Sequence, residues 1–241
     1  MHIKATNISK QFKNNILFTN VNLDLYSGKI YGLIGHNGSG KTVLMKILTG
    51  VMKPTTGTVE IDDKILHQDI QILPEVGVIF EKPEFFNDLT GKENLELLAK
   101  INKKIDDEKI IETMKQVNLD QSNKNKVKDY SLGMVQRLGI AQAIMEDQKI
   151  LILDEPTNAL DQDGVVSILR LLKQKKEKLY NEKDIEGTWI KYDQGDNYKS
   201  LYESLQGYNT CWSFASEAMC KSQLKNGDFY IYYTKDNNED Y

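Results

Sequence analysis

The chain is poor in cysteine and proline, and it lacks any long apolar run. Of its 241 residues, two are cysteine and four are proline. Cys211 and Cys220 fit neither a disulfide framework nor a C-x-x-C metal pair, so we expect two ordinary thiols in a reducing compartment. No apolar run approaches the roughly 20 residues of a membrane-spanning helix, and the first ten residues carry no signal-peptide-like apolar segment. These absences predict a cytosolic protein.

The chain also lacks a strong charge of either sign, but its charges are unevenly distributed. The net charge is −4, which gives no reason to expect a nucleic-acid partner. From Asn181 onward, 6 lysines stand against 11 acidic residues, and this tail holds both tryptophans, 8 of the 12 tyrosines and no proline. The length suits one large domain with a small appendage. We therefore divide the chain into a domain at residues 1–180 and an unassigned tail at residues 181–241, whose composition suggests foreign sequence.

Apolar patterns in the first part predict an α/β fold. Val21, Leu23 and Leu25 alternate with polar residues, which is typical of a half-buried strand, here in a small N-terminal antiparallel sheet. Three continuous apolar runs predict buried core strands, at residues 30–34, 76–80 and 150–153. A helical block at about residues 88–145 interrupts the strand–helix alternation of this core. Within it, Thr90 and Glu93 form a capping box, and Asp106 can cap a second helix.

Residues 35–42 read GHNGSGKT, the pattern G-x-x-x-x-G-K-[ST] of a phosphate-binding loop. The loop lies between the apolar run 30–34 and a segment with helical spacing, which is the structural context that such a motif requires. Backbone amides at the start of a helix favour negative charge, and the glycines let the backbone approach the phosphates. Lys41 would reach the β- and γ-phosphates, and the Thr42 hydroxyl would ligate Mg²⁺.

Two acidic residues follow the apolar run ILIL at 150–153. Asp154 would lie at the edge of the sheet beside the phosphates, where its carboxylate helps to hold Mg²⁺. Glu155 follows at once, and it is placed to orient or deprotonate an attacking water. Two acids after a buried strand are weak evidence alone, but together with the phosphate loop they predict an ATPase.

The spacing of four motifs resembles the ATP-binding cassette of ABC transporters, within which it is similar to the ATPases of bacitracin and antimicrobial-peptide exporters. The motifs are GHNGSGKT at 35–42, YSLGMVQR at 130–137, ILILDEP at 150–156 and NALD at 158–161. The resemblance covers about residues 2–175. It implies a P-loop NTPase fold of the ABC ATPase type, with a parallel core sheet, an N-terminal antiparallel β-subdomain and an inserted helical subdomain.

The resemblance also implies roles for single residues. Phe12 matches the aromatic position that stacks on adenine. Glu81 occupies a position where the family usually has glutamine, and with Thr42 and Asp154 it completes the implied Mg²⁺ ligands. The His36 side chain is expected to be solvated rather than catalytic, although it belongs to the loop. The loop residues implied to bind the nucleotide are Gly35, His36, Asn37, Gly38, Ser39, Gly40, Lys41 and Thr42.

YSLGM at 130–134 stands where the family signature reads L-S-G-G-Q. Ser131 and Gly133 match this signature, whereas Leu132 and Met134 differ. Ser131 is a good N-cap for the apolar helix that follows, and in the family this helix faces the γ-phosphate of a nucleotide on the opposite subunit. Asp161 would communicate across the same interface. The implied cofactors are ATP and Mg²⁺, and the implied partners are a second cassette, as a homodimer, and a separately encoded membrane permease at the inner face of the membrane.

One group of the family's ATPases is missing, a histidine after the next core strand. The three histidines are His2, His36 and His67, and all precede the signature. Around Gly187 the sequence reads DIEGTWIKYD, with neither an apolar strand nor a histidine, and FYIYY at 229–233 is the one later strand-like run. We therefore expect a cassette that ends near Lys178, is joined to foreign sequence and lacks the C-terminal part of the core. A divergent but functional C-terminal domain is the alternative.

A missing core strand would expose the edge of its neighbour, so we expect weak ATP binding or marginal stability, and poor turnover. The leading interpretation is the ATP-binding subunit of a bacterial exporter. The second is a subunit that closes on ATP but hydrolyses it slowly. A cassette linked to nucleic acid is disfavoured, because the chain has neither a coiled-coil insertion, nor a second cassette, nor a basic face.

Overall fold

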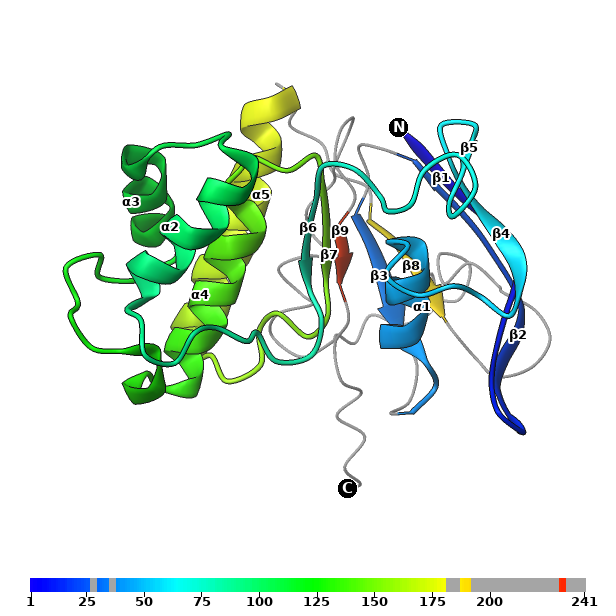
Figure 1. The fold of residues 1–241 in the computed structure, drawn as a ribbon, viewed down its shortest axis with the longest axis horizontal. Helices are drawn as coiled ribbons and strands as arrows, with labels where there is room; N and C mark the ends of the chain where they lie inside the picture. The colour runs from blue at the N-terminus through cyan, green and yellow to red at the C-terminus, as the bar shows by residue number, and fades with distance from the viewer. Residues whose placement is uncertain (27–29, 35–37, 181–186, 192–229, 233–241) are drawn as a thin grey trace, which may run out of the picture.

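The computed structural model describes residues 1–26, 30–34, 38–180, 187–191 and 230–232 (Figure 1). Its strands are β1 (His2–Phe12), β2 (Asn15–Tyr26), β3 (Ile30–Ile34), β4 (Thr56–Ile61), β5 (Lys64–Ile65), β6 (Val76–Ile79), β7 (Ile150–Leu153), β8 (Gly187–Lys191) and β9 (Tyr230–Tyr232). Its helices are α1 (Lys41–Leu48), α2 (Gly91–Asn102), α3 (Asp107–Gln116), the 3₁₀ turn η1 (Val127–Asp129), α4 (Leu132–Ile144) and α5 (Gln162–Tyr180).

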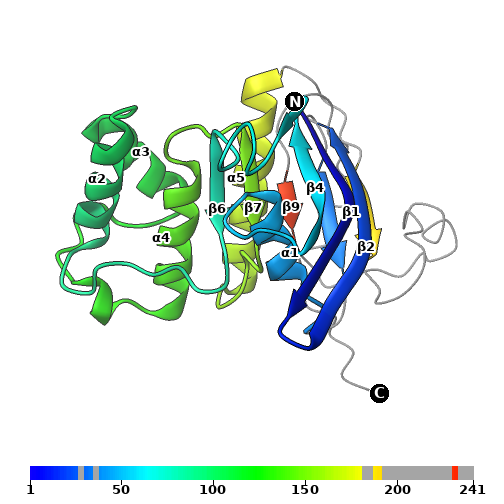
Figure 2. The same cartoon turned by 45° about the vertical axis from the view of Figure 1, so that its right-hand side comes forward.

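The N-terminal strands form an antiparallel sheet with the order β2-β1-β4-β5, which lies at one side of the molecule (Figure 2). In β2, the side chains of Val21, Leu23 and Leu25 are buried, whereas Asn22 and Asp24 between them are exposed. This confirms the predicted half-buried strand, because alternate residues of a strand face opposite sides of its sheet.

The core sheet is parallel. In the described part of the chain its strand order is β6-β7-β9-β3-β8, and each pair of neighbours is parallel. The three predicted apolar runs form β3, β6 and β7. All four residues of β7 are buried, as expected for a parallel strand that is covered on both faces. Because these strands are parallel, the chain leaves β3, β6 and β7 at the same edge of the sheet.

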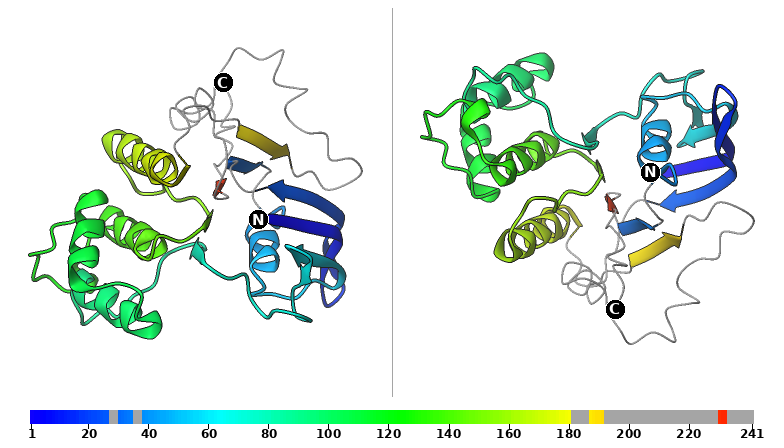
Figure 3. Two further views of the ribbon diagram at one scale, coloured as in Figure 1. Left: turned by 90° about the horizontal axis from the view of Figure 1, so that it is seen from above. Right: turned by 90° about the horizontal axis from the view of Figure 1, so that it is seen from below.

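Two hydrophobic cores cover the two faces of this sheet. Ile150 and Ile152 of β7 pack into one core with α1 and the antiparallel sheet. Leu151 and Leu153 point the other way, into a core with the helices α2 to α5. Seen from above, helices α2 to α5 accordingly lie on one side of the core strands, and α1 and the antiparallel sheet lie on the other (Figure 3). Alternate residues of β7 thus pack into both cores, and the strand that leads to Asp154 is held from both faces.

The predicted helical block is present as α2, α3, η1 and α4. The capping box is confirmed: the Thr90 hydroxyl accepts a hydrogen bond from the amide of Glu93, whose carboxylate accepts one from the amide of Thr90. The carboxylate of Asp106 caps α3 by accepting from the amide of Lys109 at 2.9 Å. These caps satisfy backbone amides that a helix start leaves unpaired, which is why both helices begin where the sequence predicts.

The expectation of a missing core strand was wrong, since two segments of the tail join the core sheet. β9 pairs with both β7 and β3, and β8 pairs with the other side of β3. Neither edge of β3 is therefore left open. β9 comes from the aromatic run FYIYY, and Tyr and Ile favour strands. GTWIK at 187–191 lacks the apolar run of a buried strand, but pairing beside β3 needs only its backbone donors and acceptors.

Candidate nucleotide-binding site

The phosphate loop is described from Gly38 onward, and the implied residues Gly35, His36 and Asn37 lie outside the described part of the chain. Gly38 and Gly40 have φ values of 81° and 93°, a left-handed conformation that favours glycine. A Cβ on Gly40 would lie 2.9 Å from the side chain of Leu17 in β2. The end of the loop therefore packs directly against the antiparallel sheet.

The loop leads into α1, whose first residue is Lys41. Gly40 is the N-cap of this helix, so the amides of its first turn are available to an anion at the loop. Lys41 is only 5% exposed, and its ammonium donates a hydrogen bond of 3.3 Å to the hydroxyl of Ser39, which is fully buried. A buried ammonium beside a helix N-terminus suits a phosphate chain.

Thr42 and Asp154 meet at the edge of the core sheet. The Thr42 hydroxyl donates a hydrogen bond of 2.5 Å to the Oδ2 atom of Asp154. The position of Asp154 is fixed by its own amide, which donates to the carbonyl of Ile79 at the end of β6 at 2.8 Å. The two predicted Mg²⁺ ligands therefore lie side by side, one from α1 and one from the end of β7.

The electrostatics of Asp154 favour a cation. Asp154 is only 4% exposed, and burial raises the pKa of its carboxyl. The charges of Glu155 and Glu81 raise this pKa further, whereas hydrogen bonds from the Thr42 hydroxyl and the Glu81 amide lower it. A divalent cation would compensate this buried charge. A hydroxyl and a carboxylate are oxygen ligands of the kind that Mg²⁺ takes alongside phosphate and water, so the residues fit the ion.

Glu155 is held by a partner that the sequence analysis did not single out. The side-chain amide of Asn158 donates to the carboxylate of Glu155, and the Asn158 backbone amide donates to its carbonyl at 3.0 Å. Gln136 of α4 donates to the carbonyl of Pro156 at 3.0 Å and so ties this loop to the helical block. Asn158 stands in the NALD motif three residues after Glu155, a spacing that could have suggested the contact.

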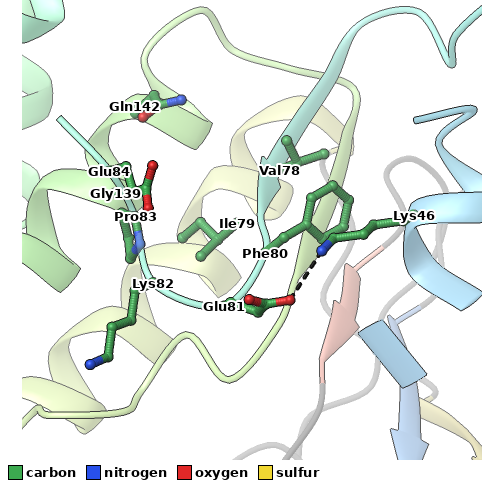
Figure 4. Close-up of a pocket in the computed structure, with 10 residues that line it drawn as sticks. All are labelled: Lys46, Val78, Ile79, Phe80, Glu81, Lys82, Pro83, Glu84, Gly139 and Gln142. Atoms are coloured by element: carbon green, nitrogen blue, oxygen red, sulfur yellow. Dashed lines mark hydrogen bonds and ion pairs between the residues drawn. The ribbon is translucent and has the colours of Figure 1, made fainter. Parts of the chain in front are cut away.

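Glu81 follows β6 and forms an ion pair with Lys46 of α1, with 3.0 Å between the Oε1 and Nζ atoms (Figure 4). Its side chain is 68% exposed. Its backbone amide contacts the Asp154 carboxylate, so the residue lies beside the predicted Mg²⁺ ligands. Sequence reasoning missed this ion pair with Lys46. Both residues line a cavity of about 640 Å³, together with residues of α4 and the segment 78–84.

Ser131, Gly133 and Asp161 form a second group, on α4 and the start of α5. The Ser131 hydroxyl accepts from the amide of Met134 at 3.2 Å, which confirms the predicted N-cap of α4. A Cβ on Gly133 would lie 3.0 Å from the carbonyl of Ala159 in the NALD motif. The Asp161 carboxylate accepts from the amide of Gly164 at 3.0 Å and so caps the first turn of α5.

Comparison with known proteins agrees with this arrangement. The family model described as ABC transporter matches residues 18–158, which is more than half of the chain. The chain belongs to the ABC transporter family. The ATP-binding proteins of this family are ATPases, and this chain is one of these ATP-binding proteins.

Three similar proteins illustrate the match. YybJ, an ABC transporter ATP-binding protein of Bacillus subtilis (strain 168), is 42% identical over 176 residues, which are 73% of this chain and 81% of YybJ. The bacitracin transport ATP-binding protein BcrA of Enterococcus faecalis is 42% identical over 171 residues, which are 70% of this chain but only 56% of BcrA. The dimeric structure of MJ0796, a bacterial ABC transporter cassette, superposes with a TM-score of 0.70 and 26% identity, and covers 83% of this chain and 98% of that one.

These matches agree with two expectations. The sequence similarity to YybJ spans 73% of this chain, as expected if the tail does not resemble the family. The likeness to MJ0796 confirms the ABC ATPase fold. In the described part of the cassette, none of the helices is both long enough and apolar enough to cross a membrane.

Phe12 lies at the end of β1, at the tip of the β1–β2 hairpin, and it is 46% exposed. Leu17 and Phe18 of the same hairpin are the residues that a side chain on Gly40 would meet, at 2.9 and 3.0 Å. The hairpin that carries the exposed Phe12 ring therefore rests against the phosphate loop.

Proposed function

We propose that this cassette binds Mg²⁺–ATP and hydrolyses it to drive a membrane exporter of peptide antibiotics or similar compounds. The observation that carries the proposal is the 2.5 Å contact between Thr42 and Asp154 beside the buried ammonium of Lys41. A cation ligand pair and a phosphate-binding lysine at one sheet edge suit the anionic end of a nucleotide, with Mg²⁺ to neutralise charge on the phosphates.

Glu155 is the residue we propose for activation of the attacking water. Its carboxylate follows Asp154 directly, and Asn158 holds it in place through a side-chain hydrogen bond. A general base needs a fixed position within hydrogen-bond reach of its proton, and such a group contributes typically 10²–10⁴-fold to a rate. Glu81, beside Asp154, is proposed to take part in Mg²⁺ or water coordination.

The second group, Ser131, Gly133 and Asp161, is proposed to act on a second copy of the chain. Ser131 is exposed at the N-terminus of α4, where unpaired helix amides favour a phosphate. The similar MJ0796 cassette is a dimer, which supports a head-to-tail homodimer in which each signature meets the nucleotide of the other copy. Asp161, capping α5 beside the signature, would communicate across this interface.

We propose that a separately encoded permease docks at the cavity in Figure 4 and holds the cassette at the inner face of the membrane. The cavity is bounded by Lys46 and Glu81 on one side and by Gly139 of α4 on the other. Pro83 packs so closely on Gly139 that a Cβ there would lie 2.3 Å from its ring. Phe86 beyond it is 65% exposed and offers apolar surface to a partner. The bacitracin transport protein BcrA supports a peptide antibiotic as the exported compound.

The experiment that tests the proposal is a Mg²⁺-dependent ATPase assay on the purified chain, with calorimetry of ATP binding. Lys41→Ala is expected to abolish the heat of ATP association. Glu155→Gln is expected to abolish turnover while ATP still binds, because it removes the base and keeps the size of the side chain. If ATP does not bind the wild-type protein, or if turnover survives Glu155→Gln, the proposal is wrong.

A second candidate is a cassette that closes on ATP but turns it over slowly. The observation that favours it is the placement of the three histidines. His2 lies at the start of β1, His67 follows β5 in the N-terminal part, and His36 belongs to the phosphate loop, so none follows a core strand beyond the signature. Single-turnover hydrolysis measured against ATP affinity separates the two: tight binding with a very slow chemical step favours this candidate, and ordinary turnover excludes it.

A further inference from the structure

Phe12 has a charged neighbour on its own strand. The ammonium of Lys10, two residues earlier in β1, lies 5.0 Å from the centroid of the Phe12 ring. The pairing register with β2 shifts between Lys10 and Gln11, so the contact belongs to an irregular part of the strand near the tip of the hairpin. A cation within about 6 Å of a ring centroid is attracted by the negative face of the ring.

The ammonium of Lys10 is also fixed from behind. It donates a hydrogen bond of 2.7 Å to the carbonyl of Lys53. That segment is in turn tied to β1, because the amide of Thr55 donates to the Ser9 carbonyl at 2.8 Å and the amide of Gln11 donates to the Thr55 hydroxyl at 2.9 Å. Lys10 is therefore a tethered cation rather than a free surface charge, and it can hold a ring in one orientation.

The hairpin that carries this ring lies against the end of the phosphate loop. Phe18, paired directly with Lys10 across the hairpin, is buried against Gly40 at the end of that loop. Residues paired across strands share a face of the sheet, so Lys10 lies on the same face as Phe18, one of the two hairpin residues next to Gly40. Phe12 still keeps 46% of its surface exposed with Lys10 in place, which leaves a ring face for a ligand.

We infer that Lys10 is a positioning residue for the base of the bound nucleotide: it covers one face of the Phe12 ring and leaves the opposite face to the adenine. This inference rests on the proposed function. The cation restrains the ring, and it also draws π-electron density toward itself. The opposite face then repels a stacked aromatic base less, since face-to-face stacking of two electron-rich faces is otherwise unfavourable.

The test is calorimetric binding of two Mg²⁺-bound ligands, ATP and inorganic tripolyphosphate, which has the phosphates but no base. Lys10→Met keeps the apolar stem and removes the charge, and Lys10→Arg keeps the cation. We expect Lys10→Met to weaken ATP binding by about two- to fivefold, the size of an exposed cation–π contact, and to leave tripolyphosphate binding unchanged. Lys10→Arg is expected to restore ATP affinity.

Two further variants make the result specific. In a Phe12→Leu background, which removes the ring, Lys10→Met should have no further effect on ATP affinity. Lys64→Met removes an exposed lysine from β5 of the same sheet and controls for net charge; it should bind both ligands like the wild type. Thermal unfolding of each variant confirms that it is folded.

Three outcomes would overturn the inference. The first is unchanged ATP affinity in Lys10→Met. The second is an equal loss of tripolyphosphate affinity in that variant, which would mean a charge effect on the phosphates. The third is a loss of ATP affinity that Lys10→Met still causes in the Phe12→Leu background, which would mean a direct contact between Lys10 and the nucleotide. If the wild-type protein binds neither ligand, the proposed function itself fails. If both bind and Lys41→Ala abolishes this while Lys10→Met is silent, only the role of Lys10 fails.

Discussion

The hydroxyl of Thr42 donates a 2.5 Å hydrogen bond to the carboxylate of Asp154, although 112 residues separate them in the sequence. The contact joins the first turn of α1 to the end of β7. Burial is the largest influence on Asp154, and it raises the pKa of the carboxyl above its ordinary value. Without a cation, the site therefore favours the protonated carboxyl more than water does.

The first prediction concerns pH. The pKa of Asp154 is higher in the folded than in the unfolded chain. At pH values between the ordinary and the raised pKa, the ligand-free folded protein therefore binds more protons than the unfolded chain. This contribution makes the free energy of unfolding fall as the pH rises from the ordinary carboxyl range through the raised pKa. Mg²⁺ and the proton compete for the same oxygens, so Mg²⁺-dependent ATP binding should weaken as the pH falls through that pKa.

Asp154→Asn tests this prediction. The variant should lose the Asp154 contribution to the pH dependence of stability. At pH values above the raised pKa, the ligand-free variant should unfold at a higher temperature than the wild type. The factor by which Mg²⁺ strengthens ATP binding should fall at least about tenfold. Thermal unfolding and calorimetry across pH, with and without Mg²⁺, provide the measurement. Asp88→Asn, which changes a carboxylate that is 88% exposed, is the control and should behave like the wild type. Wild-type Mg²⁺ dependence in the Asp154→Asn variant would contradict the assignment.

Two glycines of the phosphate loop separate backbone strain from packing. Gly40→Ala would place an alanine at a φ of 93°, which strains the backbone, and its Cβ would lie 2.9 Å from the Leu17 side chain. Gly38→Ala has a φ of 81° but no atom within 4 Å of its Cβ. We expect Gly38→Ala to lower the free energy of unfolding by about 1 kcal/mol, the left-handed strain alone. Gly40→Ala should lose about 2–3 kcal/mol, because overpacking is added. Urea unfolding compares them; equal losses would show that Leu17 moves aside without cost.

Asn158→Ala tests the support of Glu155. The variant removes the side-chain donor to the Glu155 carboxylate. If Glu155 is the base, its loss of orientation should lower kcat by roughly tenfold, while the affinity for ATP changes little. Asn118→Ala, which removes a 3.0 Å hydrogen bond to Ser167 elsewhere, is the matched control and should keep wild-type kcat. A change confined to ATP affinity would mean that Asn158 acts on binding instead.

Ser131 allows its structural and its intersubunit role to be separated. Ser131→Ala removes the N-cap of α4 and should cost about 1 kcal/mol of stability. Ser131→Asp keeps a capping oxygen, so stability is retained, but its negative charge would face the γ-phosphate held by a second copy. In a Glu155→Gln background, ATP-driven dimers measured by light scattering should therefore be lost in Ser131→Asp. Asp106→Ala, which removes the cap of α3, should cost similar stability and leave dimers intact.

Local features of the fold were predictable from the sequence because they depend on neighbours in the chain. The caps at Thr90, Asp106 and Ser131 were correct, since each side chain bonds to an amide three residues away. The tail was not. GTWIK lacks the apolar run that predicts a buried strand, yet it pairs with β3 along all five of its residues. Whether a short segment becomes a strand depends on an open edge elsewhere, and a local pattern contains no information on that edge.

The sequence alone determined the phosphate loop, the acids after β7, the order of the motifs and the family, because these reside in spacing along the chain. Only the tertiary structure decided which groups meet: Thr42 with Asp154, Glu81 with Lys46, and Asn158 with Glu155. It also decided that the tail completes the sheet beside β3. The physical reason is that a hydrogen bond or an ion pair depends on distances of about 3 Å, which parallel strand pairing and helix packing set between segments far apart in the chain.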